Sequence, residues 1–290
     1  MKHPAHRETI AVETTEVLSH QAFEGDQYIL RLHAPECASL AQPGQFAHLS
    51  CDPMLAMRRP LSIMRVDSVK GRVDFLYKAV GRGTRLLAKR KPGETLSLLG
   101  PIGKPFTLHP DRPRALLLGG GVGMPPMVFF AEQLKTAGKS QPLVLMGSEV
   151  PFPFSKRPSQ IMVPGIPEGV IASMPLLDDR GIPSRLASLQ GYAGCYEGYI
   201  TDLARRWLDA LDAAQREEVS VYACGPHPML SSVAKLAKDY ELPCQVSLEE
   251  YMACAVGGCA GCVVKVQTPD GVAMKRVCVD GPVFEASTVF

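Results

Sequence analysis

The 290-residue sequence lacks any long apolar run. No stretch of about eighteen apolar residues is free of charges, glycine and proline, so we expect no transmembrane helix. The first seventeen residues also lack the apolar core that a signal peptide requires. These absences predict a cytoplasmic protein, and disulfides are rare in that compartment.

A charge imbalance is missing as well. The chain has 31 Lys and Arg against 29 Asp and Glu, a net charge of +2, which gives no electrostatic case for nucleic acid as a partner. It also lacks internal repeats and low-complexity tracts. Its length and 46% apolar composition are sufficient for two domains and a small third one.

The first hundred residues show short alternating runs separated by turns, among them 27–34, 45–51, 61–67 and 72–80. Strands this short and closely spaced are typical of an antiparallel barrel. One helix is expected over about Thr84 to Arg90, with Thr84 as its N-cap. After Pro110, short apolar runs at 115–118, 143–148 and 219–224 alternate with helices through Lys135 and over Pro228 to Asp239, which predicts a parallel sheet.

Nine cysteines stand out in a chain expected to be reduced. Five are scattered, namely Cys37, Cys51, Cys195, Cys224 and Cys244. The other four lie near the end in C-x4-C-x2-C spacing followed by a gap of fifteen residues, as Cys254, Cys259, Cys262 and Cys278. This is the plant-type [2Fe–2S] order, and the uncharged, glycine-rich loop between the ligands can aim backbone N–H groups at the sulfurs. A structural zinc site and free buried cysteines are the alternatives.

A second group of residues suits a flavin. Arg59 supplies a bidentate donor for a phosphate, Pro60 fixes the backbone, and Ser62 offers a hydroxyl to the ring. Tyr77 can stack on the cofactor or bind it by a hydrogen bond. Gly81 and Gly83 let the backbone approach a diphosphate at the start of the helix that begins at Thr84. The alternative is a barrel rich in turns with ordinary surface arginines.

A glycine-rich turn between an apolar strand and a helix suits a nicotinamide dinucleotide. Its expected contacts are Gly119, Gly120, Gly121 and Gly123, joined by Cys224, Gly225 and Pro226 at the end of a later strand. Cys224 has no nearby base, so we expect it to pack in the interior or to line the nicotinamide site. Glu149 follows the second strand, and a carboxylate there disfavours a 2′-phosphate, so NADH is expected.

These residues together resemble the ferredoxin–NADP reductase superfamily over about 8–240. The run E-E-Y-M-A-C-A-V-G-G-C-A-G-C-V-V-K-V and the later K-R-V-C-V-D-G-P-V-F look like electron-transfer subunits of type B dihydroorotate dehydrogenase. The resemblance implies ligation of a [2Fe–2S] cluster by the four clustered cysteines. It implies FAD contacts at Arg59, Pro60, Leu61, Ser62, Leu76, Tyr77, Lys78, Gly83 and Thr84.

The same resemblance implies an FMN-containing catalytic subunit as partner, in a two-plus-two heterotetramer. Electrons from dihydroorotate would run through the cluster and FAD to NAD⁺. No separate substrate site is found, and Ser62 and Cys224 are expected only as neighbours of the reacting rings. Rival functions are a hydrogenase-type or NAD(P)H–ferredoxin reductase subunit, and a non-catalytic redox sensor or zinc-stabilised module. The chain departs from the family at about 151–198, which is longer and richer in proline than usual.

We therefore predict a multidomain β plus α/β fold. It has an antiparallel Greek-key FAD-binding barrel over 1–110 and a parallel-sheet NAD-binding domain over 111–241. A [2Fe–2S] segment over 242–290 is too short for a core of its own, so we expect its metal to organise it.

Overall fold

The computed structural model describes residues 5–290, so the first four residues of the predicted barrel domain lie outside the described residues. The chain divides into two compact units. The first contains the described residues up to Phe106, then Ser247–Phe284 and Val289. The second contains Thr107–Val246, Glu285–Thr288 and Phe290. All four clustered cysteines therefore belong to the same unit as the barrel.

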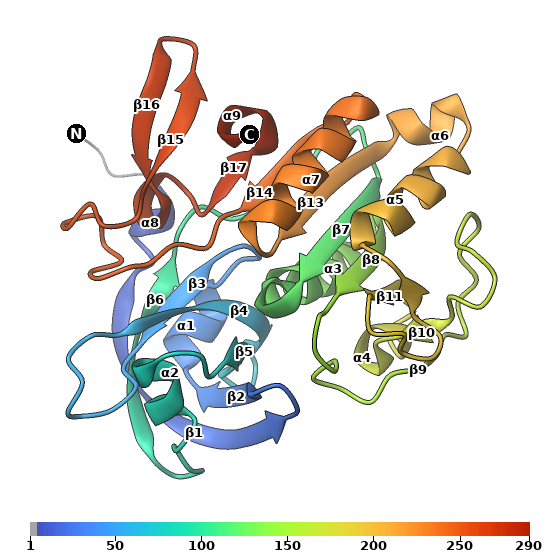
Figure 1. Ribbon diagram of the computed structural model, residues 1–290. Coiled ribbons are helices and arrows are strands. Elements are labelled where there is room, and N and C mark those ends of the chain that lie inside the picture. The colour runs from blue at the N-terminus through green and yellow to red at the C-terminus, as the bar shows by residue number, and fades with distance from the viewer. Residues whose placement is uncertain (1–4) are drawn as a thin grey trace. The chain divides into compact units, whose positions relative to one another are not determined.

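Six antiparallel strands close into a barrel in the order β1-β2-β5-β4-β3-β6 (Figure 1), which confirms the predicted barrel. Fully buried apolar side chains from β2, β4, β5 and β6, such as Leu30, Ile63, Phe75 and Leu98, form its core. The strands are β1 (Ala11–Phe23), β2 (Gln27–His33), β3 (Phe46–Leu49), β4 (Arg59–Asp67), β5 (Arg72–Lys78) and β6 (Thr95–Ile102).

Two short helices interrupt the barrel strands, α1 (Pro35–Leu40) and α2 (Arg82–Leu87), and the turn η1 (Ala5–Arg7) precedes them. The predicted bounds of α2 were wrong, because its N-cap is Gly81 and not Thr84. Thr84 lies one turn inside, where its Oγ1 accepts the Gly81 N–H at 3.1 Å and donates to the Gly81 carbonyl at 3.2 Å. A side chain in the first turn thus replaces the N-cap side chain that the sequence pattern suggested.

The second unit is built on a sheet in which β12-β11-β8-β7-β13-β14 follow one another in this order. The pairings of β12 with β11, β11 with β8, β8 with β7 and β7 with β13 are parallel, as predicted. Helix α3 packs on β7, β8 and β13, while α5 packs on β8 and β11 and α7 on β13. These elements are β7 (Arg114–Gly120), η2 (Gly121–Gly123), α3 (Met124–Ala137), β8 (Gln141–Gly147), α5 (Ile200–Asp209), α6 (Ala213–Glu217), β13 (Val219–Cys224) and α7 (His227–Asp239).

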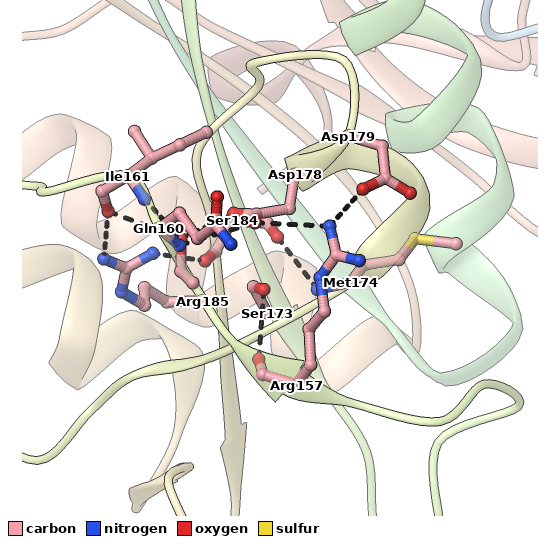
Figure 2. A network of polar contacts seen from close by, with 10 residues as sticks. Arg157, Gln160, Ile161, Ser173, Met174, Asp178, Asp179, Ser184 and Arg185 are labelled. Carbon is pink, nitrogen blue, oxygen red and sulfur yellow. Dashed lines mark hydrogen bonds and ion pairs between the residues drawn. The ribbon is translucent and has the colours of Figure 1, made fainter.

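The proline-rich stretch that gave no clear sequence pattern is held by a polar network (Figure 2). The Asp178 side chain, 2% exposed, accepts a 2.6 Å hydrogen bond from Ser159 Oγ and pairs with Arg157. The buried Arg185 donates to the Ile161 carbonyl at 2.7 Å. Such contacts between residues distant along the chain leave no local periodicity. The elements here are β9 (Arg157–Pro158), β10 (Ala172–Ser173), α4 (Pro175–Asp178), β11 (Ser184–Ser188) and β12 (Tyr196–Glu197).

The C-terminal part consists of a loop that carries cysteines, a two-stranded hairpin and two short helices. None of the helices in residues 5–290 is long and apolar enough to cross a membrane. The elements are β14 (Cys244–Ser247), β15 (Val263–Thr268), β16 (Gly271–Arg276), α8 (Val277–Asp280), β17 (Val283–Glu285) and α9 (Ala286–Val289).

Candidate cofactor and cluster sites

The four clustered cysteines form two pairs. Cys254 and Cys259 lie on the loop before β15, where the Cys259 N–H donates to Cys254 Sγ at 3.4 Å. Cys262 ends the loop and Cys278 lies in α8, and their Sγ atoms are 3.3 Å apart. The structure thus places the four residues that the spacing singled out in two contacting pairs.

This pairing fits a binuclear cluster better than a single ion. A [2Fe–2S] centre needs two thiolates at each of two irons. Zinc in a structural site needs four ligands around one point. The arrangement of the four thiols in two pairs therefore suits the cluster.

The backbone of the cysteine loop, which we define as 254–262, turns N–H groups toward sulfur. Burial raises the pKa of the Cys254 thiol, but the backbone N–H groups of Val256 and Cys259, the Cys259 thiol and the Gly258 N–H outweigh it and bring that pKa to about 7. The Gly261 N–H donates to Cys259 Sγ at 3.4 Å. A thiolate is the ligand form of cysteine, so these donors favour the state that iron requires.

Three side chains from outside the cysteine loop bind this part of the chain. Arg7 Nη2 donates to the Val256 carbonyl at 2.7 Å, and Arg276 Nη1 donates to the Gly257 carbonyl at 2.9 Å. His6 Nε2 lies 3.0 Å from the carbonyl of Val279 in α8. The sequence reasoning named none of these side chains. Only Arg276 had a local signal, as a basic residue two positions before Cys278.

Arg59 and Gly83 lie in contact, as the flavin hypothesis requires. Arg59 opens β4, and its Nη1 donates to the carbonyls of Met57 and Arg58 at 2.9 Å. A Cβ on Gly83 would be 2.6 Å from Arg59 Nε, so only glycine lets the guanidinium lie against the first turn of α2. Arg58 instead donates to the carbonyl of Ser97 at 2.7 Å and so links the start of β4 to β6. Arg59 thus lies at the glycine-containing start of α2, and its contact with a flavin phosphate stays a prediction.

The remaining flavin candidates lie on adjacent antiparallel strands, with Pro60, Leu61 and Ser62 on β4 and Leu76, Tyr77 and Lys78 on β5. No described residue forms a hydrogen bond with the half-buried Ser62 hydroxyl. Tyr77, in contrast, is 2% exposed, stacks on Tyr28 with centroids 5.4 Å apart, and its hydroxyl is 2.8 Å from His20 Nε2. Burial raises the pKa of Tyr77. In the structure, Tyr77 therefore packs against Tyr28 and contacts His20.

The two nicotinamide candidate segments of the second unit lie side by side. Gly119 pairs in register with Cys224 at the ends of the parallel strands β7 and β13. A Cβ on Gly123 would be 2.4 Å from the backbone C and O of Cys224, and one on Gly120 would be 2.3 Å from Met229 Sδ. The glycines thus keep the turn close to the 224–226 segment, where N–H groups of both can face one diphosphate. Cys224 is fully buried.

Glu149 lies just past the end of β8, the strand next to β7 in the sheet. Its side chain is exposed. Ser148 beside it is tied down, because its Oγ donates to the Val150 carbonyl at 2.7 Å. A fixed backbone thus presents the carboxylate at the carboxyl edge of the parallel sheet, where such folds bind nucleotides.

Comparisons with known proteins match both the C-terminal segment and nearly the whole chain. Residues 249–290 match the family model of the iron–sulfur cluster binding domain of dihydroorotate dehydrogenase B. The electron transfer subunit of dihydroorotate dehydrogenase B (NAD(+)) from Desulforamulus reducens is 34% identical, covering 89% of this chain and 90% of the relative. The subunit of that name from Bacillus caldolyticus is 35% identical, covering 98% of each.

Solved structures agree on the fold. The NADH-dependent reduced ferredoxin–NADP oxidoreductase structure gives a TM-score of 0.76 at 24% identity, covering 95% of this chain and 89% of that chain. A ferredoxin NADP⁺ reductase from Neisseria gonorrhoeae with bound FAD and NADP gives 0.58 at 15% identity, covering 79% and 91%. The predicted fold and resemblance are confirmed. The chain belongs to the family of electron transfer subunits of dihydroorotate dehydrogenase B (NAD(+)), components of an oxidoreductase complex.

Proposed function

We propose that this chain relays electrons between the FMN of a catalytic subunit and NAD⁺, through a [2Fe–2S] cluster and FAD, as dihydroorotate is oxidised to orotate. The observation that carries the proposal is the pairing of the four cysteines within the unit that also holds Arg59 and Gly83. A shared unit supports the transfer of electrons between two cofactors bound by it.

The proposal assigns one cofactor to each of three parts of the chain. Residues 1–110 bind FAD, 111–241 bind the nicotinamide dinucleotide, and 242–290 bind the cluster. When bound, the flavin would exchange a hydride with the nicotinamide and single electrons with the cluster. The partner is a catalytic subunit in a two-plus-two heterotetramer, and a cytoplasmic location is part of the same proposal.

The chain's own residues bind and orient in this scheme. Arg59 holds a flavin phosphate, and the Ser62 hydroxyl donates toward the ring. The backbone N–H groups of the glycine turn hold the dinucleotide's diphosphate, because a strand-to-helix turn points them at one spot. Cys254, Cys259, Cys262 and Cys278 ligate the cluster. No side chain of this subunit takes part in breaking bonds of dihydroorotate.

The test removes one cofactor at a time. Purified without oxygen, the chain should hold iron, labile sulfide and FAD, and should reduce a dye with NADH. The variant C259S should lose the iron and electron exchange with the partner but keep FAD and dye reduction. R59A should lose FAD and both activities, while the surface variant K265Q should keep all of them. Full FAD content in R59A, or zinc in place of iron, would overturn the assignment.

The partner is tested by purification of the tagged full chain from its own cells. We expect a co-purified protein that releases FMN on denaturation and oxidises dihydroorotate. Co-purification of a hydrogenase or a ferredoxin-linked complex, with no dihydroorotate oxidation, would assign the same relay to another enzyme.

A further inference from the structure

Two arginines reach the cysteine loop from opposite ends of the chain. Arg7 belongs to η1, and its guanidinium binds the carbonyl of Val256 at 2.7 Å. Arg276 ends β16, and its guanidinium binds the carbonyl of Gly257 at 2.9 Å. The two bound carbonyls are consecutive. Two cations therefore hold one short piece of backbone between Cys254 and Cys259.

Both bound carbonyls lie inside the cysteine loop. Val256 and Gly257 follow Cys254 by two and three positions and precede Cys259 by three and two. The backbone of the same loop turns the N–H groups of Cys259 and Gly261 to sulfur at 3.4 Å each. The two guanidinium groups therefore place positive charge on the segment that holds the ligands.

We infer that Arg7 and Arg276 are positioning residues that hold the cysteine loop and raise the reduction potential of the cluster through their positive charge. A positive charge beside the cluster stabilises the negative charge that reduction adds to it. Donors to the sulfurs stabilise the added negative charge of a reduced cluster and raise its potential. The inference rests on the proposed function, because it needs the cluster at these cysteines.

The positive charges of both arginines are available for this role. No carboxylate in the described part of the chain lies within ion-pair distance of either guanidinium. The Asp280 carboxylate contacts Arg276 through the backbone, where it accepts the Arg276 N–H at 2.8 Å. The charge of Arg276 therefore acts on the Gly257 carbonyl.

Gly257 makes this arrangement sterically feasible. Its φ of +86° is one that other residues rarely adopt. A Cβ there would be 2.5 Å from Val279 Cγ2 and 3.4 Å from Arg276 Nη1. The glycine thus lets the backbone of the cysteine loop pass close to both Val279 and Arg276.

The test measures the potential of the cluster in the whole, cofactor-loaded chain. Single variants R7Q and R276Q remove the charge, and R7K and R276K keep it. K265Q removes a neighbouring exposed cation on β15 that binds no carbonyl of the cysteine loop in the described contacts. An anaerobic titration followed by electron paramagnetic resonance reads the cluster apart from the flavin. Iron and labile sulfide are counted first for every variant.

We expect R7Q and R276Q each to lower the ratio of reduced to oxidised cluster about tenfold at a fixed potential, equal to about 59 mV for one electron. The lysine variants should recover part of the loss, and K265Q should match the wild-type chain. Unchanged potentials in fully loaded R7Q, or an equal shift in K265Q, would overturn the inference.

Two further outcomes keep the inference apart from the proposed function. A wild-type chain without iron and sulfide would overturn the cluster assignment itself. If R276Q alone loses its iron, the potential of R7Q becomes the test of the inference, because Arg7 lies far from the ligands in sequence. A fully loaded R7Q with a lowered potential would then support the inference.

Discussion

The cysteine loop and the glycine turn use the same chemistry, but they are built in different ways. In the proposed function, both point backbone N–H groups at a negatively charged group. The turn at 119–123 is held by parallel strands, since Gly119 pairs in register with Cys224. The cysteine loop lies between β14 and β15 without a ladder of its own, and the side chains of Arg7 and Arg276 hold its carbonyls. Regular structure fixes one site, and charges from distant residues fix the other.

The largest expected effect is that of a methyl group added to Gly123 in the glycine turn, compared with one added to Gly258 in the cysteine loop. In G123A the new Cβ would be 2.4 Å from the backbone of Cys224, and backbone atoms cannot turn aside. We expect the free energy of unfolding to fall by about 3 kcal/mol, which lowers Tm by roughly 6–12 °C. NADH binding should also weaken. G258A, whose Cβ meets nothing within 4 Å, should change Tm little. Tm is measured by calorimetry. Equal Tm values for G123A and G258A would contradict the view that the glycine turn is fixed by regular structure and the cysteine loop by side chains.

Acid should weaken the unit that holds the cysteine loop. Burial, and then the charge of Arg58, lowers the pKa of His48 to about 4 from its ordinary 6.5. Between these values the unfolded chain binds a proton that the folded chain does not. Stability therefore falls as the pH drops from about 6.5 to 4, by about 2 kcal/mol at pH 5, and no further below pH 4.

The variant H48Q checks this pH dependence, because glutamine does not titrate. Unfolding in urea at pH 8 and pH 5, followed by a signal from the barrel, should show a smaller pH effect in H48Q than in the wild-type chain. The same pH effect in both chains would mean that His48 does not cause it.

A methyl group on Gly257 tests how closely the cysteine loop is fitted. Alanine at a φ of +86°, with its Cβ 2.5 Å from Val279 Cγ2, should cost about 1–2 kcal/mol. G257A should therefore bind less iron and sulfide than G258A, while FAD content and NADH-dependent dye reduction stay unchanged. Iron analysis and visible absorption measure both. Full iron content in G257A would show that the loop adapts more easily than these contacts indicate.

The smallest effect concerns which dinucleotide the glycine turn receives. Replacing Glu149 by glutamine removes the carboxylate that disfavours a 2′-phosphate. The ratio of kcat/KM for NADPH to that for NADH should rise about fivefold, close to 1 kcal/mol. Glu217 is a matched control, since it is exposed and lies just before β13, at the amino edge of the sheet. E217Q should leave the ratio unchanged, and the same rise in both variants would exclude a specific role for Glu149.

The sequence pattern predicted what local order determines. Apolar runs gave the strands β7, β8 and β13, and glycine spacing indicated the turn that lies beside Cys224. Contacts between residues distant along the chain escaped it. Arg7 and Val256 are 249 positions apart, and a lone arginine in a polar segment has no pattern. The bounds of α2 were missed because Thr84 caps from inside the first turn.

The clasp of Arg7 on Val256 has a consequence for the order of synthesis. Arg7 is made 249 residues before Val256. At 5–20 residues per second, Val256 follows after about 12–50 s. The clasp therefore closes only after Val256 has left the ribosome, long after the barrel strands, and cluster insertion is expected to follow that step. A chain interrupted before Cys278 would carry a finished barrel and no electron carrier beyond its flavin.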